Sequence, residues 1–256
     1  MSAVDLGSRF LHGSLADGVL RVVIDRPERR NALTIEMYHG IKKAAVLAER
    51  DPAVDLLLIT AEGEYFCVGG EMAGQHEGGQ PLDRETDGLD LTPFVQLERC
   101  PKIVLLGIGG MCQGGGLVMT LMSDLAVVSE RARFRVPELL RGVADCYLGA
   151  RLAARVGIAR AKHLLFTARY FSAAEALAMG LVSEVVPHER LDAAIDETIA
   201  LVRQTAPGAR SAIKRDLNRH LPPIDMPMFA ESLRGDEVRE GFQAFAEKRP
   251  PSWVKR

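Results

Sequence analysis

The sequence predicts an α/β fold, and three observations support this prediction. Apolar runs of strand length alternate with helical patterns over the first two thirds of the 256 residues. The run KIVLLGI (Lys102–Ile108) is continuously apolar, which is typical of a strand covered on both faces. From Glu189 onward the pattern is helical only. We therefore expect a largely parallel sheet with helices on its faces, followed by a helical C-terminal region.

The first strand and helix are expected before residue 51. The segment Gly18–Asp25 alternates and is rich in β-branched residues, which favours a strand. The sequence RPERRNA then indicates a turn, and Thr34 is a suitable N-cap for a helix that ends near Arg50. One face of this helix is expected to be apolar, with Ile35, Tyr38, Ile41, Ala45 and Ala48.

The middle of the chain continues the alternation. A short buried strand is expected over Asp55–Thr60, and the apolar run Lys102–Ile108 forms another. Between them, Ala73–Asp90 is rich in glycine and charge and lacks periodicity, so it is expected to be a loop that is functional or disordered. A helix over Gly114–Ser123 and a strand over Asp124–Ser129 follow.

Helices dominate the remainder. They are expected over Leu148–Arg155 and Ile158–Thr167, and Ser172 with Glu175 forms a capping box that opens another helix. Leu181–Pro187 is the last expected strand. The helical pattern after Glu189 is interrupted by prolines, namely Pro207, Pro222, Pro223 and Pro227.

Composition and charge argue against several classes of function. The formal net charge of -2 and pI near 6.3 do not suggest a broad nucleic-acid or anionic-membrane surface. Neither C-x-x-C nor Cys/His clustering occurs, so we expect no metal site and reduced thiols at Cys67, Cys100, Cys112 and Cys146. No apolar run approaches the roughly 20 residues of a membrane span. The N-terminus lacks an apolar signal core, and a cytoplasmic location is expected.

Two glycine clusters are the most informative motifs. CVGGEM (Cys67–Met72) and GMCQGGG (Gly110–Gly116) each follow an apolar, strand-like run. They match neither G-x-G-x-x-G nor G-x-x-x-x-G-K-[ST], and G-x-S-x-G is also absent. Each cluster alone is compatible with an ordinary tight turn. Together they favour two free backbone N–H groups that converge on one carbonyl oxygen as an oxyanion hole.

Five segments then resemble the crotonase family, also called the enoyl-CoA hydratase/isomerase family. They are RPERRNALT (Arg26–Thr34), GEYFCVGGEM (Gly63–Met72), GGMCQGGG (Gly109–Gly116), SDLAVVSERARFRVPELLRG (Ser123–Gly142) and REGFQAFAEKRPP (Arg239–Pro251). The resemblance implies a spiral core of ββα units over residues 1–190 and a helical region for oligomerisation and active-site cover over residues 191–256. It also implies a homo-oligomer, a trimer or a hexamer, and acyl-CoA thioester substrates without a permanently bound cofactor.

The same resemblance assigns roles to individual residues. The oxyanion donors fall on the backbone N–H groups of Gly70 and Gly115. The CoA moiety is expected at two places in the chain, and the residues implied are Arg29, Arg30, Ala32, Gly69, Glu71, Met72, Phe245 and Lys248. For the arginines the alternative is a solvated turn, and for Phe245 and Lys248 it is an ordinary helix face.

The expected acid and base residues differ from those of the family's hydratases. Hydratases of the family use two glutamates, and the first lies two residues after the glycine triplet, where this chain has Val118. The second corresponds to Glu138, after Pro137. With a one-residue gap, Asp145 matches an aspartate of dienoyl-CoA isomerases. The alternatives are a structural salt bridge for Glu138 and a surface loop or helix N-cap for Asp145.

The loss of one hydratase acid at Val118 favours double-bond isomerisation over hydration. A hydrolase or decarboxylase of CoA thioesters that uses the same oxyanion hole is the alternative enzyme. A non-catalytic acyl-CoA-binding regulator is the alternative from another class. Nucleophilic chemistry by Cys67 or Cys112 is not favoured, because no partner histidine is evident in the sequence. Cys146 and Tyr147 are expected to pack, with Tyr147 a minor candidate for proton donation.

Overall fold

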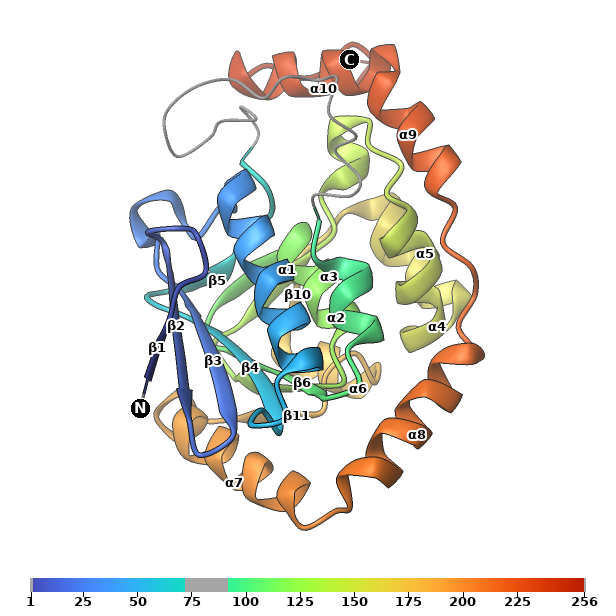
Figure 1. The fold of residues 1–256 in the computed structure, drawn as a ribbon. Coiled ribbons are helices and arrows are strands. Elements are labelled where there is room, and N and C mark those ends of the chain that lie inside the picture. Colours follow the sequence, from blue (N-terminus) through green and yellow to red (C-terminus); the bar gives the residue numbers. More distant parts are fainter. Residues whose placement is uncertain (1, 72–91, 256) are drawn as a thin grey trace.

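The computed structural model describes residues 2–71 and 92–255. Its larger sheet has seven strands in the order β1-β2-β3-β4-β6-β8-β11 (Figure 1). The strands β1 to β3 pair antiparallel, and β3, β4, β6, β8 and β11 run parallel. Their bounds are β1 (Ser2–Val4), β2 (Leu11–Ala16), β3 (Val19–Ile24), β4 (Leu56–Ala61), β6 (Ile103–Ile108), β8 (Leu125–Ser129) and β11 (Glu184–Val186).

A second sheet has four short strands in the order β10-β9-β7-β5. They are β5 (Tyr65–Cys67), β7 (Met111–Gln113), β9 (Arg133–Arg135) and β10 (Phe171–Ser172). Along the chain, β4 is followed by β5, β6 by β7 and β8 by β9, so each pair contributes one strand to each sheet. The helices α2 (Phe94–Arg99) and α3 (Gly115–Met122) follow the first two pairs. This is the ββα spiral that the resemblance implied.

The helix α1 (Ile35–Arg50) begins as the sequence predicted. The Thr34 hydroxyl oxygen accepts a hydrogen bond from the Met37 amide at 3.2 Å, which satisfies one orphan donor of the first turn. The predicted apolar face is partly wrong, because Ile35 and Tyr38 are only half-buried. The buried positions are Met37, Gly40, Ile41, Ala44, Ala45 and Ala48.

Each face of the larger sheet has its own apolar core. The main core joins alternate strand residues such as Val22 and Ile59 to α1, α2 and α3. A smaller core on the other face joins Leu58 and Leu105 to Ile195 of α7 (Leu191–Arg203). Because both faces are covered, the parallel strands are apolar at successive residues rather than alternately, as the run Lys102–Ile108 predicted.

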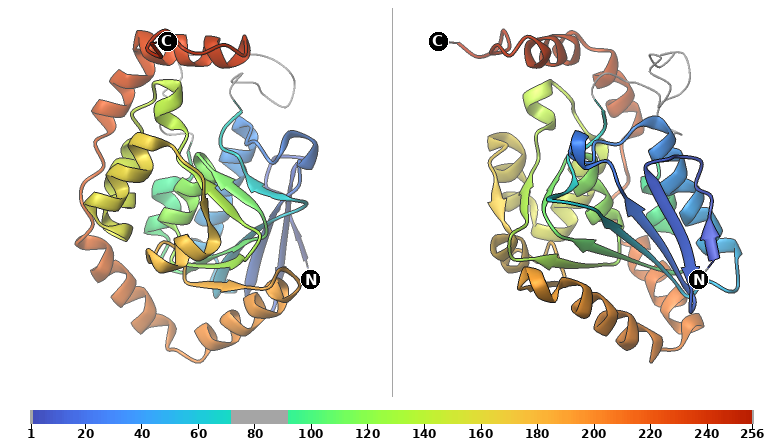
Figure 2. Two further views of the ribbon diagram at one scale, coloured as in Figure 1. Left: turned by 180° about the vertical axis from the view of Figure 1, so that it is seen from behind. Right: turned by 90° about the vertical axis from the view of Figure 1, so that its left-hand side faces the viewer.

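The C-terminal region is helical, as predicted. After α7 come α8 (Pro207–Arg219), α9 (Met226–Arg234) and α10 (Asp236–Ala246), which run around the outside of the molecule (Figures 1 and 2). The Lys214 ammonium of α8 pairs with the Asp124 carboxylate at 2.6 Å and donates to the Lys102 carbonyl at 3.0 Å, which ties α8 to the start of β6. No helix in the described ranges is both long and apolar enough to span a membrane.

Further helices lie between β9 and α7. The chain forms a 3-10 turn η2 (Glu138–Arg141), a π-helical turn η3 (Leu148–Leu152), α4 (Ala153–Val156), α5 (Ile158–Thr167), α6 (Ala173–Ala178) and a 3-10 turn η4 (His188–Arg190). The capping box of Ser172 and Glu175 is present at α6, as predicted. The helix expected over Leu148–Arg155 therefore begins as a π-helical turn, and the strand expected over Leu181–Pro187 shortens to β11.

The strands β1 and β2 and the four strands of the second sheet were not predicted. They are too short or too mixed in polarity for a periodic pattern to identify them. The expected loop over Ala73–Asp90 lies outside the described residues.

Candidate active site

The two glycine clusters leave the second sheet at neighbouring points. Cys67 of β5 and Cys112 of β7 are register partners on adjacent parallel strands, so the loops that follow them lie side by side. Gly69 has φ +102° and Gly114 has φ +55°, which favour residues without a Cβ. A Cβ on Gly114 would lie 3.2 Å from the Gly69 Cα, so the two loops are in direct backbone contact.

The amides of Gly70 and Gly115 are both free of internal hydrogen bonds in the described part of the chain. The residues on either side of Gly70 are hydrogen-bonded to Leu33. The Leu33 amide donates to the Gly69 carbonyl at 2.9 Å, and the Glu71 amide donates to the Leu33 carbonyl at 2.8 Å. Gly115 is the first residue of α3, whose amide has no acceptor within the helix. Two donors are therefore left for a ligand.

The Glu138 carboxyl group lies beside the second glycine loop. Its Oε1 is 3.2 Å from the position that a Cβ on Gly114 would take, and its Oε2 is buried without a hydrogen-bond partner. Burial raises the pKa of Glu138 to about 8, and the nearby Asp145 carboxylate contributes in the same direction. The salt bridge that was the structural alternative for Glu138 is not found among the described residues.

Asp145 lies between η2 and η3, close enough to Glu138 to influence its ionisation. The Asp145 Oδ1 accepts a hydrogen bond from the Leu148 amide at 2.9 Å, so this side chain caps the following turn. Burial raises the pKa of Asp145 to about 6, against the effect of the amides of Leu148 and Tyr147. Asp145 therefore caps the following helical turn, as the alternative expected, and also lies near Glu138.

Val118 is 1% exposed and belongs to the main core. Its side chain carries no exchangeable proton, so it cannot act as an acid or base. The two flanking residues that the sequence expected to pack are also buried. The Cys146 thiol lies 3.6 Å from the Met226 sulfur, and the Tyr147 hydroxyl is 3.2 Å from the Thr92 hydroxyl.

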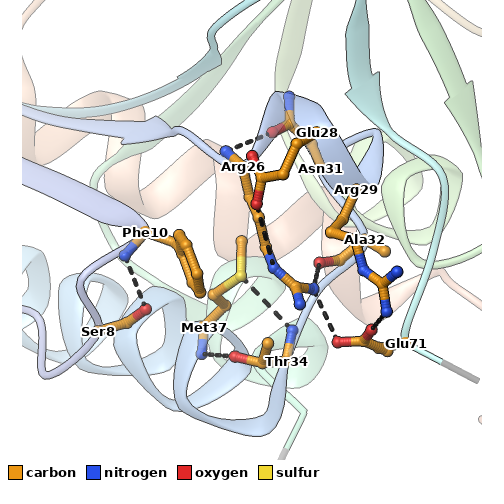
Figure 3. Close-up of polar contacts among 10 residues, drawn as sticks. All are labelled: Ser8, Phe10, Arg26, Glu28, Arg29, Asn31, Ala32, Thr34, Met37 and Glu71. Atoms are coloured by element: carbon orange, nitrogen blue, oxygen red, sulfur yellow. Dashed lines mark hydrogen bonds and ion pairs between the residues drawn. The ribbon is translucent and has the colours of Figure 1, made fainter. Parts of the chain in front are cut away.

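Part of the expected CoA set gathers around Glu71 (Figure 3). Its carboxylate pairs with Arg29 Nη2 at 2.8 Å and with Arg26 Nη1 at 2.7 Å, and Arg26 Nη1 also donates to the Ala32 carbonyl at 3.0 Å. Burial alone would raise the pKa of Glu71, but the hydrogen bonds from both arginines outweigh it and lower the pKa. Arg29 is thus half of an ion pair rather than a freely solvated cation.

The other expected CoA residues are spread more widely. The Arg30 guanidinium lies 5.6 Å from the centre of the Tyr65 ring, and the exposed Phe245 ring lies 4.0 Å from the Arg141 guanidinium of the same chain. Lys248 is exposed just after α10. Within the described residues, no hydrogen bond, ion pair or ring contact joins Phe245 or Lys248 to Glu71 or to the residues bonded to it, Arg26 and Arg29. Met72 lies outside the described residues.

Asn31 organises the expected CoA turn and was not identified in the sequence. It is fully buried with φ +55°, and its Oδ1 accepts from the Arg26 amide at 2.7 Å. Its Nδ2 donates to the carbonyls of Glu62 and Tyr65 at 2.9 and 2.6 Å. These bonds tie the turn after β3 to the connection between β4 and β5. An Asn within a charged turn is the only signal the sequence offers.

Tyr38 was also missed, because the sequence assigned it to the apolar face of α1. A Cβ on Gly70 would lie 2.9 Å from the Tyr38 hydroxyl oxygen, and a Cβ on Gly115 would lie 2.8 Å from it. The hydroxyl therefore stands between the two glycines whose amides are free. A polar atom on an otherwise apolar face is the signal that could have identified it.

The four cysteine thiols are reduced in this structure. All four cysteines are free and buried, and burial raises the pKa of Cys67 to about 12, so its thiol stays protonated near neutral pH. Within the described ranges, no group of three or more His, Cys, Asp or Glu side chains is arranged to hold a metal ion.

Comparison with known proteins identifies the family. The family model described as enoyl-CoA hydratase/isomerase matches residues 14–256. A crotonyl-CoA hydratase of Syntrophomonas wolfei is 30% identical over 91% of this chain and 93% of the relative. A mevalonyl-coenzyme A hydratase of Aspergillus fumigatus is 28% identical over 92% of this chain and 91% of the relative.

Solved structures give the same result for the fold. The crystal structure of an enoyl-CoA hydratase from Mycobacterium avium subsp. paratuberculosis superposes with a TM-score of 0.84 at 28% identity, covering 96% of this chain and 99% of that one. The family match spans most of the chain and includes the helical C-terminal region and both sheets, except for β1 and the first residues of β2. The chain therefore belongs to the enoyl-CoA hydratase/isomerase family of acyl-CoA enzymes.

Proposed function

We propose that this enzyme isomerises a double bond in an unsaturated acyl-CoA thioester. The observation that supports the proposal best is the pair of half-buried carboxyl groups, Glu138 and Asp145, with Glu138 beside the loop that carries the free Gly115 amide. The position of the other hydratase glutamate holds Val118, which is part of the core. Two carboxyl groups on one side of a substrate can move a proton between two carbons without adding water.

The reaction requires one proton to leave and one to arrive. For a 3-enoyl thioester, a carboxylate removes a proton from C2, and the electron pair moves into the thioester carbonyl to give a dienolate. The amides of Gly70 and Gly115 donate hydrogen bonds to the oxygen that becomes negative. Protonation at C4 then forms the C2–C3 double bond and restores the carbonyl. No water is consumed and no thiol is released.

The difference between the two carboxyl groups suggests their roles. With a pKa of about 6, Asp145 is mainly ionised at neutral pH, whereas Glu138, with a pKa of about 8, is mainly protonated. Asp145 is therefore assigned as the base and Glu138 as the acid. Because the groups lie close together, their two ionisation steps belong to the pair.

We propose that the CoA moiety lies along the turn after β3 and the first glycine loop. Arg29 and Arg30 supply positive charge for the phosphates, and Ala32, Gly69, Glu71 and Met72 border the pantetheine. Arg29 must then share its guanidinium between Glu71 and a phosphate, or leave Glu71 altogether. Phe245, which lies against Arg141, and the exposed Lys248 are assigned to the nucleotide.

Hydration is the second candidate. Two similar proteins, from Syntrophomonas wolfei and Aspergillus fumigatus, are named as hydratases. In that reaction, Glu138 and Asp145 would activate water in place of the missing glutamate. The two candidates differ in whether water enters the product.

The deciding experiment incubates the protein with 3-hexenoyl-CoA and, separately, with crotonyl-CoA. Isomerisation predicts a rise in conjugated-enoyl absorbance with the first substrate, no 3-hydroxyacyl product and no free thiol. The Glu138→Gln variant is expected to lose at least a hundredfold in rate while retaining acyl-CoA binding, because one proton carrier is removed. The exposed Glu189→Gln variant is the matched control. Hydration of crotonyl-CoA without isomerisation would select the second candidate, and undiminished turnover by Glu138→Gln would exclude that residue.

A further inference from the structure

The Tyr38 hydroxyl occupies the space that side chains at Gly70 and Gly115 would otherwise fill. The hypothetical Cβ atoms of these residues would approach it to 2.9 and 2.8 Å, closer than a Cβ normally approaches any heavy atom. Tyr38 projects from the first turns of α1, whereas the glycines follow β5 and β7. Three separate elements thus bring one hydroxyl and two free amides to one place.

The ring of Tyr38 is held by packing. Its centre lies 5.9 Å from that of Phe94, with the rings at 82° to each other, and Phe94 in turn contacts Tyr147 edge-on at 5.0 Å. Edge-to-face contacts of this kind orient aromatic rings. The hydroxyl itself has no hydrogen-bond partner among the described residues. A polar group that is held in place but lacks a partner is available to a ligand.

The ionisation state of Tyr38 suits a donor. Burial raises the pKa of the phenol far above its ordinary range, and Cys67, Asp145 and Glu138 contribute in the same direction. The hydroxyl therefore keeps its proton at any pH at which the protein works. A neutral phenol can donate a hydrogen bond to a developing negative oxygen without itself becoming charged.

We propose that the Tyr38 hydroxyl is a third hydrogen-bond donor to the thioester oxygen, beside the amides of Gly70 and Gly115. This inference rests on the proposed use of those two amides, but not on which reaction follows. A side chain at Gly70 or Gly115 would displace the hydroxyl from this position.

The test uses Tyr38→Phe, which keeps the ring and removes only the hydroxyl. Because that hydroxyl has no partner in the described part of the chain, its loss leaves no buried group unpaired and folding should be retained. The carbonyl stretch of bound butanoyl-CoA, an unreactive saturated thioester, is measured by infrared difference spectroscopy. Fewer donors polarise the carbonyl less, so the band is expected to move to higher frequency in Tyr38→Phe than in the wild type.

Turnover is measured on the same proteins. Removal of one oxyanion donor is expected to lower the rate of 3-hexenoyl-CoA isomerisation by about 10²-fold, with a much smaller change in KM. The control is Tyr170→Phe, whose exposed hydroxyl accepts from Arg135 at 3.1 Å and which should change neither readout.

An unchanged carbonyl band in Tyr38→Phe would overturn the inference, even if turnover fell, because the hydroxyl would then act without touching the oxygen. A shifted band in a protein that does not isomerise 3-hexenoyl-CoA would support the donor and reject the proposed reaction. The two proposals therefore fail separately.

Discussion

Cys67 and Cys112 are register partners on the adjacent parallel strands β5 and β7, so the two glycine loops leave the sheet at the same edge. Each loop follows its strand within three residues, and the loops touch at Gly69 and Gly114. Strand pairing alone therefore brings together two amides that lie forty-five residues apart, Gly70 and Gly115. The predictions below test this arrangement and the carboxyl groups beside it.

Replacing Gly69 with alanine should damage both stability and activity. Gly69 has φ +102°, and a Cβ there would lie 3.4 Å from the Gly115 nitrogen, inside the space between the loops. The strained backbone should cost about 1–3 kcal/mol of unfolding free energy. Chemical denaturation measures this loss. The matched control is Gly208→Ala in α8, where a Cβ meets no atom within 4 Å and stability should not fall. Equal stability of the two variants would contradict the argument.

The rate of isomerisation should depend on pH as a bell. Asp145 must be ionised to accept a proton, so the rate rises as pH passes through about 6, and Glu138 must be protonated, so it falls as pH passes through about 8. Steady-state kcat/KM measured from pH 5 to 9 tests the two limbs, which report the ionisation steps of the pair. The alkaline limb should disappear in Glu138→Gln along with most of the rate. A profile that rises continuously to pH 9 would rule out Glu138 as the acid.

Glu138 should also make the fold less stable as pH rises. Its pKa is higher in the folded protein than in the unfolded chain, so the native state binds more protons between about pH 4.5 and 8. The contribution of Glu138 to the unfolding free energy is therefore largest below about pH 4.5. It decreases between about pH 4.5 and 8, by at most about 1.4 kcal/mol per pH unit.

Glu138→Gln removes this dependence. The unfolding free energy of the variant relative to the wild type should increase from pH 5 to pH 8, measured by urea denaturation at each pH. Asp145 contributes in the same direction in both proteins, and because its ionisation is coupled to that of Glu138, the difference between the proteins reports on the pair. A constant difference across this range would mean that Glu138 has an ordinary pKa in the folded protein.

Asn31→Ala should be among the more damaging single changes outside the acid–base pair. It removes the three hydrogen bonds that the buried Asn31 side chain makes. The Arg26 amide and the carbonyls of Glu62 and Tyr65 then lose this partner. Each unsatisfied buried group costs about 1–3 kcal/mol. Thermal or chemical unfolding measures the loss. Asn218→Ala, which removes one such bond from α8 to the Glu98 carbonyl, should lose clearly less.

The sequence predicted the long elements more reliably than the short ones. The helix α1, the strands β3, β4, β6 and β8, and the capping box of α6 are close to their predicted bounds, because local patterns and caps specify them. The second sheet was not predicted, since its strands contain two or three residues and are stabilised by pairing partners far away in the chain. Of the candidate site, Gly70, Gly115, Glu138 and Asp145 were predicted through the family resemblance, whereas Tyr38 and Asn31 were not.

The sequence by itself determined the α/β class, the helical C-terminal region and the two glycine loops, because hydrophobic periodicity, capping residues and glycine content act over a few neighbouring residues. Only the tertiary structure decided that the Tyr38 hydroxyl stands between Gly70 and Gly115, that the Glu138 Oε2 atom is buried without a hydrogen-bond partner, and that Arg29 pairs with Glu71. The physical reason is that burial, hydrogen bonding and ionisation depend on neighbours brought together by chain crossovers, and local sequence carries no record of those distances.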